Sequence, residues 1–357
     1  MPSLFSFLLH RQEKAMNELI VIDGSMGEGG GQVLRTSLAL SMITGKPFRI
    51  TNVRAGRKNA GLLRQHFTAL RAAAEVSGAG VRGAEIGSRE VVFEPWDVVP
   101  GDYHFSVGTA GSTTLLLQTI LPALVTASSP SHILLEGGTH NPFAPPFDFL
   151  EKAFLPILRR MGAEVTCHLK RPGFYPAGGG RLAVTVNPAP RLRPINLSDR
   201  GEFRRCLCRA VVAQLPRTIG EREVKVACEA LGWDRENSTV ESWTQSFGPG
   251  NVLSIELDSE AVTEVITGFG SRGVRAEDVA KGAVREAQRY IKAGVPVGVH
   301  LADQLLIPMA LAGGGSFRTL SPSPHTLTNI QVLKIFLDVG IECRQTAEDA
   351  SEIIVNG

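Results

Sequence analysis

Residues 18–43, ELIVIDGSMGEGGGQVLRTSLALSMI, place a short apolar run, a glycine-rich turn and a second apolar run in direct succession. Glu18–Ile22 predicts a buried strand. Gly27–Gly31 is almost entirely glycine, which suits a tight turn and a close approach of the backbone. Gln32–Ile43 carries apolar residues at helical spacing, and a Gly-Lys-Pro triplet follows it. A strand, a turn and a helix in this order predict an α/β unit.

The same plan recurs further along the chain. A Thr-Ala-Gly-Ser turn at residues 109–112 precedes an apolar helix, and a strand follows at His132–Glu136. Leu301–Leu311 predicts another helix, and three glycines separate it from a strand at Ser316–Leu320. Such repetition indicates one supersecondary unit used several times. We therefore predict an α/β (α+β) fold of repeated βαβαββ-type units, in which helices cover one face of each sheet.

Other segments depart from this plan. Residues 1–16 precede the first expected element, and we predict that they are an N-terminal extension. Residues 195–272 follow a proline-rich stretch, are richer in charge and carry their own strand-like and helix-like runs, so we predict a small inserted α/β domain. Residues 17–194 and 273–357 then form the main domain, which the chain re-enters through a long helix at 273–293.

Composition limits the class of protein. The formal net charge is only +2, whereas a protein that grips long nucleic acid is usually more basic. The 5 cysteines are odd in number and include no Cys-x-x-Cys pair, which argues against a disulfide framework and a structural zinc site. We expect a reducing compartment, the cytoplasm. No apolar run approaches the length of a membrane span, so we expect no membrane partner.

The glycine turn is the first candidate for chemistry. It opens a helix, so its backbone N–H groups can face a phosphate. The Gly-Lys-Ser/Thr of a Walker A loop is missing, as is the acidic residue of a dinucleotide-binding fingerprint. The alternative is a plain tight turn. Glu28 stands among these glycines, and a carboxylate beside a phosphate usually needs Mg²⁺ or Mn²⁺ between the two negative groups.

A cationic segment is the second candidate. Basic residues and no acidic residue lie between Asn52 and Ala74, and Arg35 lies on the preceding helix. Guanidinium groups match the geometry of phosphates. Arg54 and Arg57 stand at the end of an expected strand, which favours a binding role, whereas a solvated helix face is the alternative for the other cations. For His66 the alternative is a histidine packed at the edge of the core.

Three polar positions mark otherwise apolar helices. Gln118 faces either solvent or a ligand. His300–Gln304 opens a helix, where Asp303 would serve as an ordinary N-cap in the plainest interpretation. His325 lies in the Pro-rich approach to a helix, whose dipole favours the neutral imidazole that a nucleophilic nitrogen requires. A loop histidine without a role is the alternative.

Taken in order, these segments resemble the RNA 3′-terminal phosphate cyclase family. The resemblance covers nearly the whole chain after residue 16, and the order of the short motifs makes it specific. The stretches that carry it are Asp23–Gln32, Arg54–Arg57, Gly61–His66, Gly137–Thr139, Phe174–Gly180 and the His-x-Leu-Thr-Asn pattern at His325–Asn329.

The resemblance implies a ligase-class enzyme that uses ATP to convert the 3′-phosphate of RNA into a 2′,3′-cyclic phosphate. His325 would attack the α-phosphate of ATP and become adenylated. AMP would pass to the RNA 3′-phosphate, and the 2′-hydroxyl would then expel it. The implied cofactor is Mg²⁺ or Mn²⁺, the implied fold resembles that of enolpyruvyl transferases, and a homodimer is kept as a hypothesis.

The resemblance also implies roles by position. Glu28 would hold the metal at the ATP phosphates. The ATP pocket would take in Gln118, Pro145, Pro146, His300, Leu301, Ala302, Asp303 and Gln304. The phosphates or the RNA end would be held by Arg35, Arg54, Arg57 and His66. Some members have a tyrosine at the position of His300, where the ring stacks on adenine, so this chain departs from them there.

Rival interpretations predict other chemistry. A non-catalytic relative acting as a ribosome-assembly factor would lack the nucleophile, and His325 within its full motif argues against it. A Lys-x-Asp-Gly polynucleotide ligase would need a lysine where Val21 stands. An enolpyruvyl-transferring enzyme would need no adenylated residue. Between Arg191 and Lys225 nine basic residues stand against four acidic ones, which predicts either RNA contact or a solvated surface.

Overall fold

The fold is given by a computed structural model, which describes residues 18–357. The predicted extension at 1–16 lies outside the described residues. The first unit runs through β1 (Ile20–Asp23), α2 (Gly31–Thr44), β2 (Phe48–Thr51), α3 (Arg64–Ser77), β3 (Gly80–Arg82) and β4 (Val91–Glu94). Its sheet has the order β1-β2-β4-β3, with β1 and β2 parallel and the other pairs antiparallel.

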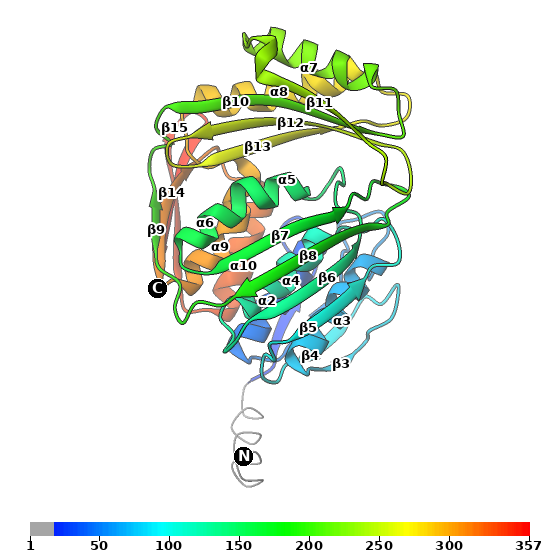
Figure 1. Ribbon diagram of the computed structural model, residues 1–357. Helices are drawn as coiled ribbons and strands as arrows, with labels where there is room; N and C mark the ends of the chain where they lie inside the picture. The colour runs from blue at the N-terminus through cyan, green and yellow to red at the C-terminus, as the bar shows by residue number, and fades with distance from the viewer. Residues whose placement is uncertain (1–17) are drawn as a thin grey trace.

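Two further units repeat this order (Figure 1). The second contains β5 (Asp102–Ser106), α4 (Thr113–Leu124), β6 (Ser131–Gly137), α5 (Phe147–Phe149), the π-helical η1 (Leu150–Phe154), α6 (Leu155–Arg160), β7 (Glu164–Arg171) and β8 (Gly180–Asn187). The third contains β9 (Ile195–Leu197), α9 (Val299–Leu311), β14 (Gly314–Thr319), α10 (Pro324–Phe336), β15 (Gly340–Ala347) and β16 (Ala350–Asn356). The sheet orders β5-β6-β8-β7 and β9-β14-β16-β15 match the first, which confirms the predicted α/β fold of repeated βαβαββ-type units.

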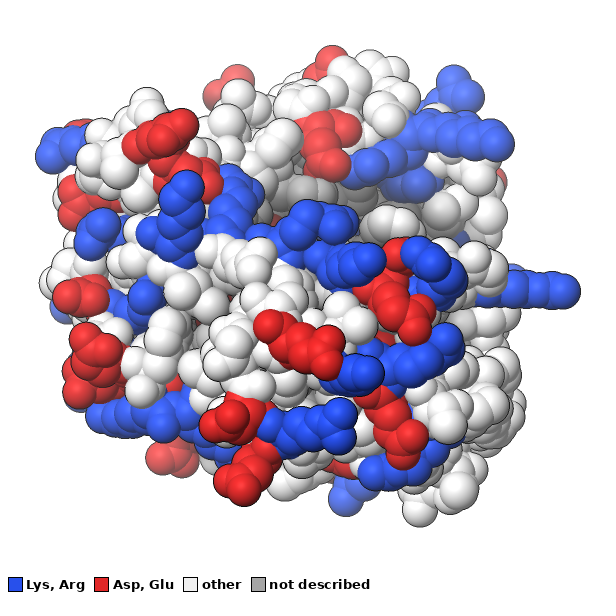
Figure 2. Space-filling model, turned by 90° about the horizontal axis from the view of Figure 1, so that it is seen from above, with Lys and Arg blue, Asp and Glu red and all other residues white. Residues whose placement is uncertain are grey.

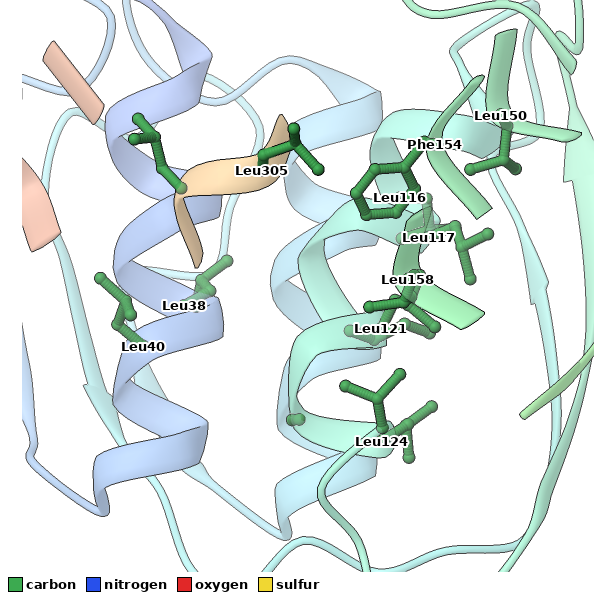
Figure 3. Close-up of a cluster of buried hydrophobic side chains, with 14 of the residues drawn as sticks. Leu38, Leu40, Leu116, Leu117, Leu121, Leu124, Leu150, Phe154, Leu158 and Leu305 are labelled. Carbon is green, nitrogen blue, oxygen red and sulfur yellow. The ribbon is translucent and has the colours of Figure 1, made fainter. Parts of the chain in front are cut away.

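Apolar helices fill the space between the three sheets. α2 contacts α3, α4 and α10, so it is buried around most of its circumference. Figure 3 shows Leu38 of α2, Leu117 of α4 and Leu305 of α9 in one cluster, beside Phe154 and Leu158. Truncating one such buried leucine to alanine typically costs about 2–5 kcal/mol. This core fixes the helix starts, where the polar residues of the site lie.

A fourth sheet interrupts the third unit between β9 and α9. It contains β10 (Phe203–Ala213), α7 (Thr218–Leu231), the 3₁₀ turn η2 (Arg235–Asn237), β11 (Ser238–Trp243), β12 (Gly250–Ser259), β13 (Thr263–Phe269) and α8 (Ala276–Ala293), and its strand order is β11-β10-β12-β13. Helices α7 and α8 lie side by side on one face of this sheet (Figure 1).

The limits of the inserted domain follow from this packing. The predicted insert, 195–272, and the predicted main domain, 17–194 plus 273–357, stay predictions. β9 pairs with β14 of the third unit, and α8 contributes Ala280, Ala283 and Ala287 to the core of the fourth sheet. We therefore propose that the inserted domain runs from β10 to α8. Among the described residues no helix is long and apolar enough to cross a membrane.

Candidate active site

A cavity of about 790 Å³ lies between the helix starts of the large domain and strand β13 of the insert. First-turn residues of four helices line it: Gly31 of α2, His66 of α3, His300 of α9 and His325 of α10. Each helix start carries partial positive charge and unpaired backbone N–H groups. In every repeat the helices follow their strands in the same order and direction. The repeats therefore bring the first turns of these helices to one cavity. The cavity is thus suited to anionic groups such as phosphates.

Nearly all the predicted site residues meet at this cavity. Those that line it are Glu28, Arg35, Arg54, Arg57, His66, Gln118, Pro145, Pro146, His300, Asp303, Gln304 and His325. Leu301 and Ala302 do not line it, since they point into the core and are 0% and 1% exposed. The motif places them beside ATP in sequence, but the helix turns their side chains to its other face. The roles assigned to all these residues stay predictions.

The glycine turn carries Glu28 to the cavity. Gly27 has a φ of 57°, and a Cβ there would lie 2.1 Å from the hydroxyl of Thr328 on α10. The backbone N–H of Glu28 donates to the same hydroxyl, with a distance of 3.1 Å. On its other side the turn meets Gly56, whose N–H donates to the carbonyl of Gly29 at 3.1 Å. The turn is therefore held between α10 and the Arg54–Arg57 loop.

His325 belongs to the first turn of α10 and not to the loop before it. Its Nδ1 lies 2.6 Å from Oε1 of Gln32 and 2.6 Å from Oε2 of Glu28. Only the contact with Gln32 has hydrogen-bonding geometry, and Oε2 of Glu28 has no hydrogen-bond partner among the described residues. Because both oxygens are acceptors, the ring proton belongs on Nδ1. Nε2 then carries the free lone pair.

Gln32 is fixed by a network that joins three helices. Its Nε2 donates to Oδ1 of Asp303 at 2.6 Å, which turns its Oε1 toward His325. Asn329 donates to the carbonyl of Asp303 at 3.1 Å and accepts from the hydroxyl of Thr36 at 2.8 Å. Burial raises the pKa of Asp303, although His325, Gln32 and Arg35 oppose this. Asp303 keeps some exposed surface in the cavity while protein surrounds it on the other sides.

Three guanidinium groups line the cavity beside Glu28. Burial, together with Arg54, lowers the pKa of Arg35 to about 10, so the group stays charged at neutral pH. Arg54 donates from Nη1 to the carbonyls of Asn59 at 2.5 Å and Gly61 at 2.9 Å, which fixes its orientation. Arg57 donates from Nη2 to Oε1 of Glu28 at 2.5 Å. This cluster provides several positive charges for a phosphate-bearing ligand.

His66 is neutral and only 3% exposed. The N–H of Leu63 donates to its Nδ1 at 3.3 Å, so the proton of the neutral ring lies on Nε2. Burial is the main cause that lowers the pKa of His66 to about 3, and Arg35 and Arg54 add to it. A Cβ at Gly31 would lie 2.3 Å from this Nε2. Helix α2 must therefore begin with a glycine here for the ring to reach the cavity wall.

Polar and apolar groups face each other across the opposite end of the cavity. Gln118 of α4 donates its amide hydrogen to Gln304 of α9. Pro145 is held by the hydroxyl of Thr114, which donates to its carbonyl at 2.6 Å. His300 lies at the rim, where its Nε2 is 3.6 Å from Oε1 of Glu286. The ring of Phe143 is fully exposed at the same rim. An aromatic base fits between such walls.

Sequence reasoning missed the wall that the insert provides. Val265, Thr267 and Phe269 of β13 line the cavity, and Glu264 accepts a hydrogen bond from the N–H of Gly298 at 2.7 Å, just before α9. An apolar strand gives no sign in the sequence that it borders a site. Gln32 was missed as well, although its place directly after the last glycine of the turn was a usable signal.

Two carboxylates line the cavity, Glu28 and Asp303, and Glu28 is the one predicted to hold a divalent metal. Among the described residues no group of three or more His, Cys, Asp and Glu side chains could hold a metal by itself. Mg²⁺ is commonly held by one or two carboxylates together with substrate phosphates, so a single carboxylate fits that pattern. The buried Oε2 of Glu28, which lacks a hydrogen-bond partner among the described residues, is a suitable ligand atom.

The fold and this cavity define an α/β protein with a cleft that three guanidinium groups line and that holds a histidine with a free ring nitrogen. The family model described as RNA 3′-terminal phosphate cyclase matches residues 26–343. Curated relatives with the same description include a Koribacter versatilis protein, 52% identical over 92% of this chain and 92% of its own length. A Pseudomonas fluorescens relative is 49% identical over 94% and 97% of the two chains, and a Ralstonia nicotianae relative 51% identical over 94% and 96%. The chain belongs to the RNA 3′-terminal phosphate cyclase family.

Proposed function

We propose that this protein is an ATP-dependent RNA 3′-terminal phosphate cyclase that works through an adenylated His325. Family membership and relatives near 50% identity support the overall reaction. The proposed steps are those that its chemistry requires. A free 3′-phosphomonoester has no adequate leaving group, and joining it to AMP supplies one.

The contact of His325 Nδ1 with Oε1 of Gln32, 2.6 Å apart, is the observation that carries this proposal. With the proton held on Nδ1 by Gln32, the lone pair of Nε2 is free to attack the α-phosphorus of ATP. The new N–P bond forms as the bond to pyrophosphate breaks. An oxygen of the RNA 3′-phosphate then attacks the AMP phosphorus, and the N–P bond breaks.

The last step closes the ring on the RNA. The 2′-hydroxyl attacks the 3′-phosphorus, loses its proton and expels AMP, which gives the 2′,3′-cyclic phosphate. In this proposal Arg35, Arg54 and Arg57 bind the negative charges of the ATP phosphates and the RNA end. The neutral His66 donates from Nε2 to a phosphate oxygen.

The remaining site residues are assigned to the nucleotide. Gln118, His300, Asp303 and Gln304, with Pro145 and Pro146, would bind adenosine between α4, α9 and the 141–146 loop. Mg²⁺ or Mn²⁺, when bound by Glu28 and the phosphates, would neutralise charge on the leaving pyrophosphate. In the alternative proposal of a non-catalytic assembly factor, the orientation of His325 would serve no chemical step.

Product analysis tests the reaction. An RNA labelled at its 3′-terminal phosphate is incubated with the protein, ATP and Mg²⁺, and the label is then challenged with phosphatase. We expect the label to become phosphatase-resistant only when ATP is present, and to migrate as a 2′,3′-cyclic nucleotide after nuclease digestion. A label that stays fully phosphatase-sensitive with either metal would contradict the proposal. Light scattering of the same sample tests the hypothesis of a homodimer.

A further inference from the structure

Two exposed aromatic rings and two cations without ion-pair partners among the described residues lie near the cavity, on the first unit (Arg64), the second unit (Arg171 and Tyr175) and the insert (Phe247). The rings are those of Tyr175, 68% exposed, and Phe247, 64% exposed. The cations are Arg64 and Arg171, neither of which forms an ion pair with any residue from 18 to 357. We call these four residues the aromatic platform. None of them lines the cavity itself.

Close backbone contacts connect the platform to the phosphate end of the cavity. Gln65, which lines the cavity next to His66, lies 3.0 Å from where a Cβ on Gly111 would be. One residue further, Ala110 lies 2.9 Å from the equivalent position on Gly178, in the turn that exposes Tyr175. Arg64 lies against Gly108 at the start of the same ridge. A short chain of direct contacts therefore joins the cavity lining at Gln65 to the turn that carries Tyr175.

The outer half of the platform is held by direct contacts with its neighbours. A Cβ on Gly179 would lie 2.1 Å from the ring of Phe247, so the 174–180 turn and the 244–249 loop touch directly. The guanidinium carbon of Arg171 lies 4.0 Å from the centre of the Phe247 ring, and its Nε donates to the carbonyl of Gly179 at 2.6 Å. A fixed exposed ring loses little conformational entropy when a planar ligand stacks on it.

We propose that the aromatic platform binds the nucleotides immediately before the 3′-terminal phosphate of single-stranded RNA, by base stacking on Tyr175 and Phe247 and by phosphate contacts with Arg64 and Arg171. Exposed aromatic side chains interleaved with cations are the usual way in which proteins hold single strands without reading their sequence. The inference rests on the proposed function, because the cavity must hold the RNA end.

The upper face of the insert is a weaker candidate for the same RNA. Figure 2 shows Lys and Arg side chains on that face interleaved with Asp and Glu. Several are paired, as Arg222 is with Glu277 at 3.4 Å and Arg275 with Asp278 at 2.9 Å. Paired cations offer less net attraction to a phosphate backbone. Within the basic stretch at Arg191–Lys225 only Arg209, Arg217 and Arg222 form ion pairs with described residues, so RNA contact and a solvated surface both stay predictions for it.

Binding measured by fluorescence anisotropy, without ATP, tests the platform directly. The probes are 5′-labelled, 3′-phosphorylated RNAs of two and of ten nucleotides. We expect the wild-type protein to bind the decamer at least tenfold more tightly than the dimer. Tyr175→Ala should weaken binding of the ten-nucleotide RNA about tenfold and leave binding of the two-nucleotide RNA unchanged, because only the longer RNA reaches the platform. Tyr175→Phe keeps the ring and should bind like the wild type.

Second variants separate a local effect from misfolding. Phe247→Ala should also lose about tenfold for the decamer. Arg171→Gln should lower the salt dependence of decamer binding. Equal affinity of the wild type for both lengths, or unchanged decamer binding in Tyr175→Ala and Phe247→Ala, would overturn the inference and leave the rings to a protein partner.

Cyclisation of the two-nucleotide RNA is assayed on the same protein preparations. The aromatic platform and the proposed cyclase function can then fail separately. Cyclisation without a length effect overturns the platform alone. A length effect that the variants remove, with no cyclisation, overturns the proposed function and leaves the platform standing.

Discussion

His66 and His325 occupy matching places in two repeats of one fold, yet their rings have different hydrogen-bond partners and carry the proton on different nitrogens. Each lies in the first turn of the second helix of its unit, α3 and α10. The Nδ1 of His66 accepts a hydrogen bond from the backbone, whereas the Nδ1 of His325 donates to Gln32. Nε2 is therefore a donor in His66 and a free lone pair in His325. The repeat fixes where a histidine lies, and its neighbours decide what the ring can do.

The largest expected effect separates the two histidines by substitution. His325→Ala should reduce cyclisation at least about a thousandfold, because the nucleophile is lost. His66→Ala should impair use of the RNA phosphate but leave adenylation of His325 detectable. Cyclisation rates and adenylation are measured for both, with the exposed His168→Ala as a control that keeps wild-type activity. Equal loss of adenylation in His66→Ala and His325→Ala would break the comparison.

Glu28 lies beside His325, with its Oε2 2.6 Å from Nδ1 of the ring. Glu28→Gln should slow adenylation about a hundredfold and weaken its dependence on Mg²⁺ or Mn²⁺, because a neutral amide is a poorer ligand. Adenylation rates are measured across a metal titration. Glu90→Gln is a matched control, since that carboxylate pairs with Arg49 at 2.9 Å on an exposed surface. An unchanged metal dependence in Glu28→Gln would remove Glu28 from the metal site.

The buried state of His66 predicts a stability effect in acid. Because the pKa of His66 falls to about 3 in the folded protein, the unfolded chain binds the proton first, and stability drops as pH falls below 6.5. At pH 5 this amounts to about 2 kcal/mol of the free energy of unfolding. Glu223 and Glu264, whose pKa values burial raises to about 7 and about 8, act in the opposite direction in both proteins. Urea unfolding at pH 7.5 and pH 5 should therefore show a change in the free energy of unfolding that is about 2 kcal/mol less favourable in the wild type than in His66→Gln. The same change with pH in His66→Gln and in the wild type would contradict the assigned burial effect.

Gln32 is the residue that gives His325 a different tautomer from His66, because its Oε1 accepts the Nδ1 proton of His325. Gln32→Met should lower kcat for adenylation about tenfold, since Nδ1 loses its hydrogen-bonded acceptor, with little change in KM for ATP. Gln288→Met on α8 removes a glutamine that lies outside the cavity and serves as the control. A change confined to KM would argue that Gln32 binds ATP and does not orient the ring.

The smallest expected effect concerns His300, at the rim of the cavity. His300→Tyr should lower KM for ATP about threefold with kcat unchanged, because a larger ring stacks better on adenine. Steady-state kinetics with ATP and GTP measure it. A kcat that falls together with KM would show that His300 does more than stack.

The repeated fold could be predicted from the sequence because each unit contains a recognisable local pattern of turn residues and apolar residues. The glycines before α2, the Thr-Ala-Gly-Ser turn before α4 and the apolar run of α9 all precede or form elements within a few residues. The strand β9 has only three residues, and its partner β14 lies beyond the whole insert, so no local pattern could assign it. Helix α8 was predicted as a helix, but its packing against α7 depends on tertiary contacts.

The site was predictable where motifs carry polar residues and unpredictable where geometry decides. His325, Glu28 and Asp303 come from three motifs, and the structure brings them to one cavity. The direction of the Gln32 amide, and so the tautomer of His325, depends on a contact 271 residues away in sequence. The wall formed by β13 is apolar and comes from the insert, which gives no local signal.

The adenylated residue itself is the most direct test of the central claim. The protein is incubated with α-³²P-ATP and Mg²⁺, digested after denaturation, and the labelled peptide is sequenced by mass spectrometry. We predict one acid-labile, alkali-stable AMP on His325, absent in His325→Ala and removed by RNA that carries a 3′-phosphate. A stable label on a lysine or on His66, or no label with either metal while cyclisation proceeds, would contradict the account.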